Sequence, residues 1–389
     1  MAGPDTVKRR CLRFVAALAA AFAGAAGCAP AARVPVPAAP AASTQEYGSN
    51  KIVAEINQLL REPYSDTQTI DVIYATNRVP TGDLSECSDA SYGLQPTGKT
   101  SYGICRVSVP KRHPVGFLEL ALNPHSDPHR YFRVLSQVPL DETSLRALIQ
   151  SRKPADALMF VHGFNVKFGE AVLRSAQLAY DLKFQGPVLL FTWPAGSAGT
   201  LDTVMINRTY EANKGNAAVS VGQLSSLFKL LASTGVTIHL MVHSMGHQVV
   251  IPALAAAAAK INAPFIGELV LNAPDFPLTD LRQMLPAIRP LTRRITLYCS
   301  YNDNAIAVSE IWNRGRRVGA CEQLPGVDVV NVGEIDAPTL GVGGLGHGYY
   351  ASRPILTDIF QLLLGLPVDR RLFMRKSEPN SVENYYLRP

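Results

Sequence analysis

The sequence has 389 residues, of which 47% are hydrophobic and 17% are charged, and its formal net charge is +6. This composition provides enough apolar surface for one large domain or two small ones. No basic stripe interleaved with aromatic residues is present, so we expect no nucleic-acid partner. The basic cluster formed by Arg314, Arg316 and Arg317 is expected to be a solvated face.

Residues 1–28 have the parts of a secretory signal peptide. A basic stretch, VKRRCLR, precedes an Ala- and Gly-rich run that is too short for a membrane span, and the segment ends at Cys28. The ending AAGC resembles a bacterial lipobox, in which the cysteine is lipidated and becomes the new N-terminus, although Ala25 stands where leucine is commonest. The alternative is an ordinary cleavage site with an incidental cysteine. Cleavage would lower the net charge to about +3, because four basic residues and one acidic residue are removed.

Residues 29–66 follow as a tether and a pre-domain segment. The stretch Ala29–Thr44 is rich in proline and alanine, cannot bury a core, and would hold the folded part away from a membrane surface. Because alanine follows Cys28, a lipoprotein of this kind is expected to be sorted to the outer membrane. We therefore expect an exported envelope protein, anchored through Cys28 and facing the periplasm or the cell surface.

Four further cysteines, Cys87, Cys105, Cys299 and Cys321, lie in the folded part. None has C-x-x-C spacing, so we expect no metal site. An oxidising compartment permits disulfides, and sequence proximity favours Cys87–Cys105 and Cys299–Cys321. Free buried thiols are the alternative.

The folded part, residues 67–366, divides into two patterns. Residues 67–135 contain strand-like segments such as TIDVIYATNR and YGICRVSVP, which predict an added N-terminal β section. From Asp156 onward, short apolar runs alternate with helical stretches. The runs are continuous rather than alternating, as in a parallel sheet covered on both faces. We predict an α/β fold with a doubly wound, mostly parallel sheet, followed by a peripheral tail at residues 367–389.

The segment IHLMVHSMGHQVVIPAL combines a buried strand with a helix, and Ser244 lies at the corner between them. A serine at such a turn projects its hydroxyl at the carboxyl edge of the sheet, where the following helix directs its free N–H groups. Small residues are needed two positions before and after the serine. Gly246 meets this need, whereas Val242 departs from the G-x-S-x-G pattern, so the motif alone leaves a helix-capping role open.

A serine nucleophile of this kind needs a histidine later in the chain. Of the eight histidines, His247 and His347 follow Ser244. His247 lies in the first turn of the same helix and would point along it. His347, in the loop GVGGLGHGYY, is the expected base, and a surface histidine is the alternative.

Three carboxylates between the serine and His347 follow predicted strands. Asp303 follows the strand two β-units beyond the serine strand, where it can meet the far nitrogen of the histidine, so it is the expected acid. Asp275, one strand nearer, is the alternative. Asp336 is too close to the strand of the histidine.

An oxyanion hole needs two backbone N–H donors. Met245 should supply one, because it follows the nucleophile, and the turn after MFVHGFN should supply the other through Phe164. We expect His162 in that turn to be structural.

The motifs FVHGFN, TWPAGS, VHSMG, NAPDF, YNDNA and GLGHGYY, in this order, resemble the α/β-hydrolase fold. More narrowly, the chain is similar to a bacterial family of esterase/lipase-like proteins catalogued as a domain of unknown function, over about residues 71–364. The resemblance implies serine hydrolase chemistry on a carboxylic ester or thioester, either a small molecule or a lipid. Ser244, Asp303 and His347 are the matching positions, and no cofactor is implied.

Other activities compete with this hypothesis. An envelope lipoprotein that keeps the fold as an inactive binding or scaffold module is the main alternative. Transfer of the acyl group to an alcohol is a second. The run Gly341–Gly346 matches G-x-G-x-x-G, but it does not connect a strand directly to a helix, so a dinucleotide site is not expected. Acyl-chain length, head group and oligomeric state are not predicted.

Overall fold

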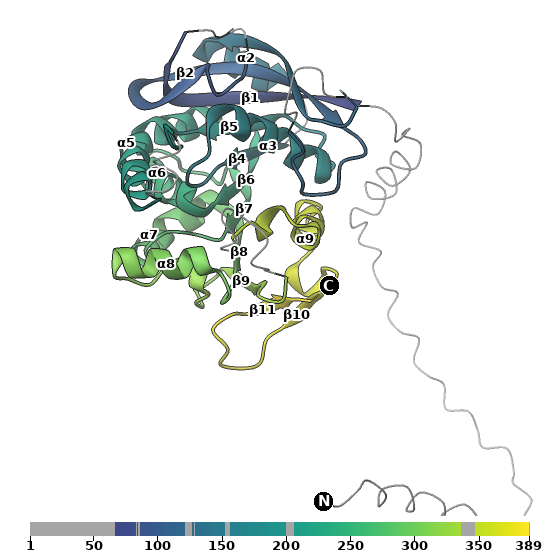
Figure 1. Ribbon diagram of the computed structural model, residues 1–389. Helices are drawn as coiled ribbons and strands as arrows, with labels where there is room; N and C mark the ends of the chain where they lie inside the picture. Colours follow the sequence, from purple (N-terminus) through teal and green to yellow (C-terminus); the bar gives the residue numbers. More distant parts are fainter. Residues whose placement is uncertain are drawn as a thin grey trace, which may run out of the picture. The chain divides into compact units, whose positions relative to one another are not determined.

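The computed structural model describes residues 67–82, 84, 86–120, 127, 129–151, 156–199, 206–335 and 347–388. The expected signal peptide and tether, Asp336 and the run Gly341–Gly346 lie outside these residues. Within the described part, 11 strands form a single mixed sheet with helices on both of its faces (Figure 1).

The sheet has the strand order β10-β11-β9-β8-β7-β6-β4-β5-β1-β2-β3. From β11 to β1 in this order each strand is parallel to the next, whereas β2, β3 and β10 pair in antiparallel fashion. Nearly every residue of the central strands is buried, because helices cover both faces. The predicted α/β fold class is confirmed. The strands are β1 Thr67–Pro80, β2 Tyr92–Pro110, β3 Arg133–Leu140, β4 Asp156–Val161, β5 Val188–Thr192, β6 Thr237–His243, β7 Ile266–Asn272, β8 Thr292–Cys299, β9 Asp328–Asn331, β10 Met374–Lys376 and β11 Tyr385–Leu387.

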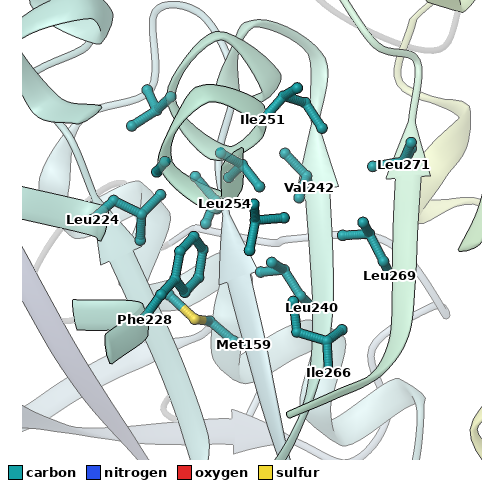
Figure 2. Close-up of a cluster of buried hydrophobic side chains, with 14 of the residues drawn as sticks. Met159, Leu224, Phe228, Leu240, Val242, Ile251, Leu254, Ile266, Leu269 and Leu271 are labelled. Carbon is teal, nitrogen blue, oxygen red and sulfur yellow. The ribbon is translucent and has the colours of Figure 1, made fainter. Parts of the chain in front are cut away.

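Two hydrophobic cores lie on the two faces of the sheet. Helices α5, α6 and α7 cover one face, and α3 and α9 cover the other (Figure 1). Figure 2 shows part of the first core, in which side chains of α5 and α6 pack against those of β4, β6 and β7. The helices are α2 Glu142–Ser151, α3 Phe168–Asp181, α5 Ile206–Ala232, α6 His247–Ala258, α7 Leu278–Ile288, α8 Asn304–Asn313 and α9 Arg353–Leu363. None of the helices described here is both long and apolar enough to cross a membrane.

Three elements differ from the sequence prediction. The N-terminal β section continues to Leu140, because β3 pairs with β2 beyond the predicted end at residue 135. Helix α8 was not predicted. The segment 367–389 is not only a peripheral tail, since β11 pairs with β9 and thereby extends the sheet. Strands of three residues are too short to show a periodic pattern, which explains the last difference.

Two disulfides join the four cysteines of the folded part. They are Cys87–Cys105 and Cys299–Cys321, the pairings that sequence proximity favoured, so this prediction is confirmed. The first fastens the β1–β2 connection to the middle of β2. The second fastens the end of β8 to the short helical turn Val318–Ala320.

Candidate active site

Ser244 occupies a sharp corner between β6 and the helix that follows. It opens the 3₁₀ turn Ser244–Gly246, and α6 begins at the next residue. Its φ angle is 52°, in the left-handed region that residues with a Cβ rarely adopt. The sequence thus folds into a strained strand-to-helix turn, which holds the serine at the carboxyl edge of the sheet.

Two glycines allow the turn after β4 to approach this corner closely. A Cβ on Gly246 would lie 2.5 Å from the carbonyl oxygen of His162, and a Cβ on Gly163 would lie 2.7 Å from the Cβ of Ser244. A side chain at either glycine would force the turn after β4 away from the Ser244 corner. The need for a small residue at Gly246 therefore comes from the neighbouring turn as well as from the corner itself.

Val242 stands where many such turns have glycine, and the structure explains why valine fits. Its side chain is fully buried and points into the core beneath the corner, near Ile251 of α6 (Figure 2). The side chain belongs to the strand face that α5 and α6 cover. A larger residue is accommodated here because it packs into the core rather than against the serine.

Ser244, His347 and Asp303 form a continuous hydrogen-bonded chain. The Nε2 atom of His347 lies 2.5 Å from the Oγ atom of Ser244. Its Nδ1 atom lies 2.7 Å from Oδ2 of Asp303. A carboxylate only accepts, so Nδ1 carries a proton, and in the neutral tautomer the Nε2 lone pair faces the serine hydroxyl. The three residues singled out in the sequence are thus brought together.

The Asp303 carboxylate has two functions in the structure. One oxygen accepts from His347, and the other accepts from the backbone N–H of Ile306 at 3.0 Å, which makes Asp303 the N-cap of α8. The residue is almost completely buried. The cap explains why α8 begins at Asn304, and an aspartate before NAIAVSEIW was the available signal for this helix.

Asp275, the alternative acid, is engaged elsewhere. Its carboxylate accepts from Tyr210 at 2.9 Å and from Ser309 at 2.5 Å, and Arg317 lies 3.4 Å away. Burial and the nearby carboxylate raise the pKa of Tyr210 to about 12. Asp275 therefore ties α5 to α8, and it is Asp303 that contacts the histidine. Arg317 is buried in this network, so the prediction of a solvated face was wrong for this residue.

The two expected oxyanion donors come from turns that lie against each other. Met245 is the second residue of the 3₁₀ turn, where an N–H has no acceptor within the helix. Phe164 lies in the turn after β4, and its N–H has no acceptor among the described residues. Because β4 and β6 are adjacent and parallel, both amides lie at the same edge of the sheet as Ser244.

His162 is held as a neutral ring inside the turn that carries Phe164. Its Nδ1 atom lies 3.0 Å from the carbonyl of Gly163, and its Nε2 atom lies 2.9 Å from Oγ1 of Thr192. The ring stacks on Trp193, whose indole N–H donates back to the His162 carbonyl at 3.0 Å. Burial, with a smaller effect of a nearby arginine, lowers the pKa of His162 to about 3. These contacts orient the turn.

Arg78 is the arginine behind this turn, and it is fully buried near the end of β1. Its guanidinium donates to the carbonyls of Val166 and Ala195, both at 2.9 Å, and to Oγ1 of Thr192 at 3.1 Å. Burial lowers its pKa to about 9, so the group stays cationic at neutral pH. One side chain of the N-terminal section thus fastens the turn after β4 and the end of β5.

The N-terminal section also reaches the helix that follows the Phe164 turn. Asp89 Oδ1 accepts from the backbone N–H of Gly169 at 2.9 Å and so caps the first turn of α3. A Cβ on Gly169 would meet Asp89 at 3.1 Å and the carbonyl of Cys87 at 3.3 Å. The Cys87–Cys105 disulfide holds this capping segment in place.

His247 does not contact the serine hydroxyl. Its Nδ1 atom donates to the carbonyl of Ser244 at 2.7 Å, and burial lowers its pKa to about 3. The ring is therefore neutral and fastens the first turn of α6.

Across the described ranges, no three His, Cys, Asp or Glu side chains converge in a way that would hold a metal ion. Asp336 and the Gly341–Gly346 run lie outside those ranges, and so does Cys28.

The fold is that of the α/β-hydrolase class. The chain belongs to the family described as alpha/beta hydrolase of unknown function (DUF900), which matches residues 140–365. The expected resemblance to that class is therefore confirmed. The matched region contains Ser244, Asp303 and His347 but not β1 and β2. Comparison with curated proteins and with solved structures gives no match.

Proposed function

We propose that this protein is a serine hydrolase that cleaves carboxylic esters or thioesters through an acyl-enzyme. The observation that carries the proposal is the chain of contacts from Ser244 through His347 to Asp303, with separations of 2.5 Å and 2.7 Å. A nucleophile, a base and an orienting acid within hydrogen-bond reach are the parts that this chemistry requires.

In the proposed mechanism, His347 takes the proton of Ser244 as the serine oxygen attacks the acyl carbonyl. Asp303 holds the ring in the tautomer that leaves Nε2 free, and it stabilises the imidazolium that forms. The Met245 and Phe164 amides stabilise the oxyanion. His347 then returns the proton to the leaving alcohol or thiol. Water attacks the acyl-enzyme with His347 as the base, and the acid is released with Ser244 restored.

The alternative is an inactive envelope protein that keeps the fold as a binding module. Two features favour the enzyme. The residues that form the site are all present and in contact, and the serine is held in a strained backbone conformation that a scaffold does not need.

The test is covalent labelling of the purified, signal-less protein with a fluorophosphonate probe, beside Ser244→Ala and His347→Ala. We expect labelling of the wild type and of neither variant, with loss of ester turnover by several powers of ten. Ser309→Ala is a matched control, because this buried serine binds Asp275 and not His347. A folded wild type that the probe does not label would favour the inactive binding module instead. If the wild type is labelled, product analysis with an added alcohol separates hydrolysis from acyl transfer.

We also propose that the protein is exported and anchored to the outer membrane by a lipid on Cys28, with the tether of residues 29–66 between anchor and hydrolase domain. Mass spectrometry of the N-terminal peptide from the native host should show a diacylglyceryl group, and Cys28→Ser should release the protein from the membrane fraction. An unmodified Cys28 in a membrane-free protein would contradict this.

A further inference from the structure

His347 has a backbone conformation that needs external support. Its φ angle is 77°, which is unfavourable for a residue with a Cβ. Nothing in local propensity favours this geometry, so contacts from other elements must hold the ring between Ser244 and Asp303.

One such contact comes from the residue before the serine. The Nε2 atom of His243 lies 3.1 Å from the carbonyl oxygen of His347. A carbonyl only accepts, so His243 is the donor. The last residue of β6, directly before Ser244, therefore supplies a hydrogen bond that fixes the backbone of His347.

The His243 ring is itself fixed by stacking. Its centroid lies 3.9 Å from that of Tyr350, with an angle of 26° between the planes. Tyr350 is buried, and the guanidinium of Arg174 lies 6.0 Å from the centre of its ring. His347 and Tyr350 are three residues apart, so the same loop is held at its carbonyl and at its aromatic side chain.

The contacts continue into the N-terminal β section. Arg174 donates to the carbonyl of Gly116 at 2.9 Å. A Cβ on Gly116 would lie 1.7 Å from the carbonyl oxygen of Ala351, so the two backbones are in direct contact. Gly116 has a φ angle of 87°, which glycine adopts without strain. A segment outside the family match thus packs against the loop that carries His347.

We propose that His243 is a positioning residue for the reaction. Its Nε2–H holds the backbone of His347 so that the imidazole of His347 reaches both Ser244 and Asp303. The contacts with Tyr350 and Arg174 keep the His243 ring in place. This inference rests on the proposed function, because it assigns His243 a role in presenting the base. His243 takes no proton in the reaction.

The protonation of His243 agrees with this role. Burial, and to a smaller extent the neighbouring His347, lower the pKa of His243 well below the usual value for histidine. The ring is therefore neutral at physiological pH, and it adds no positive charge beside the imidazolium that the mechanism forms on His347.

The test uses three variants of the signal-less protein. His243→Phe keeps a ring that can stack on Tyr350 but removes the donor. His243→Gln replaces the Nε2 donor with an amide N–H. His239→Phe is the matched control, because it makes the same change four residues earlier on β6, at a buried histidine that lies near Phe184 and Asp156.

We expect His243→Phe to lower kcat by about 10- to 100-fold, as small misplacements of catalytic groups do. KM should stay the same, and the rate of fluorophosphonate labelling should fall with kcat. His243→Gln should retain most of the wild-type kcat, and His239→Phe should leave kcat unchanged. The downfield proton resonance of the His347–Asp303 hydrogen bond should broaden in His243→Phe alone.

The outcomes separate the two proposals. A wild type that neither labels nor turns over would overturn the proposed function. A wild type that labels, beside a folded His243→Phe with wild-type kcat and labelling rate, would overturn the positioning role alone. Equal losses in His243→Phe and His239→Phe would also contradict it, because the effect would then be a general loss of packing in β6.

Discussion

Two turns at the carboxyl edge of the sheet carry opposite ends of the candidate site, and they are held in different ways. The turn after β8 carries Asp303 and is held by contacts with residues that are close to it in the sequence. Cys299 is bonded to Cys321, and the Ser300 N–H donates to the carbonyl of Gly319 at 3.3 Å. Asp303 itself caps the helix that follows.

The turn after β4 carries Phe164 and is held from a distance. Arg78 of β1 fastens Val166, and Asp89 caps the following helix. Both residues precede the region that matches the family, which begins at residue 140. The hydrolase region therefore contains its own support for the expected acid, whereas the N-terminal β section supports the expected oxyanion donor.

The largest effect should separate the two buried aspartates near the site. Asp303→Asn is expected to lower kcat by about 10⁴-fold, because the amide cannot hold His347 in the productive tautomer. Asp275→Asn should lower the free energy of unfolding by about 1 to 3 kcal/mol, because it weakens the network with Tyr210 and Arg317, with a much smaller change in kcat. Ester turnover and urea unfolding measure the two effects. Comparable losses of kcat in both variants would contradict the assignment of Asp303 as the acid that orients His347.

A smaller effect should distinguish the two disulfides. Their sequence separations are 18 and 22 residues, so loop entropy predicts a similar loss of about 3 kcal/mol when either pair is changed to alanine. We expect kcat to fall more in Cys299→Ala/Cys321→Ala, because Cys299 lies four residues before Asp303. Cys87 reaches the site only through Asp89 and α3.

Chemical denaturation and steady-state kinetics on the two double variants test this. If the Cys87–Cys105 pair affected kcat more, the distant support of the Phe164 turn would matter more than the local support of the acid.

The smallest effect is a change in the pH dependence of stability. The pKa of His247 is lowered to about 3 in the folded protein, against about 6.5 in an unfolded chain. Between these values the unfolded state binds a proton that the folded state does not, so stability falls as pH decreases below about 6.5. His247→Gln should remove about 1.4 kcal/mol per pH unit from that slope. Urea unfolding between pH 5 and 8 measures it, and the two proteins should show the same slope above pH 7.5. Parallel slopes below pH 6.5 would exclude the buried neutral ring.

The sequence predicted the architecture well where its patterns are long. Continuous apolar runs identified the central strands, and the order of Ser244, Asp303 and His347 along the chain led to the residues that lie in contact. The choice of Asp303 over Asp275 followed from topology, since an acid must reach the far nitrogen of the histidine.

What the sequence did not reveal are supports that depend on tertiary contacts. Arg78 looks like any strand residue until its guanidinium is seen bonded to three backbone carbonyls. Nothing in the sequence distinguishes His243 as a support for His347, because its acceptor lies 104 residues away. Helix α8 is hard to predict because it is short and because its capping residue, Asp303, also fits the pattern of a catalytic acid.

The left-handed backbone of Ser244 has a consequence for how the protein tolerates substitution. Glycine adopts such a φ angle freely, whereas a residue with a Cβ is disfavoured there by about 1 kcal/mol. Ser244→Gly should therefore relieve backbone strain even as it deletes the hydroxyl. For a protein that only binds, glycine would be the easier residue at this corner. Serine is less favourable than glycine for this backbone, and the nucleophilic role proposed for its hydroxyl would account for its presence.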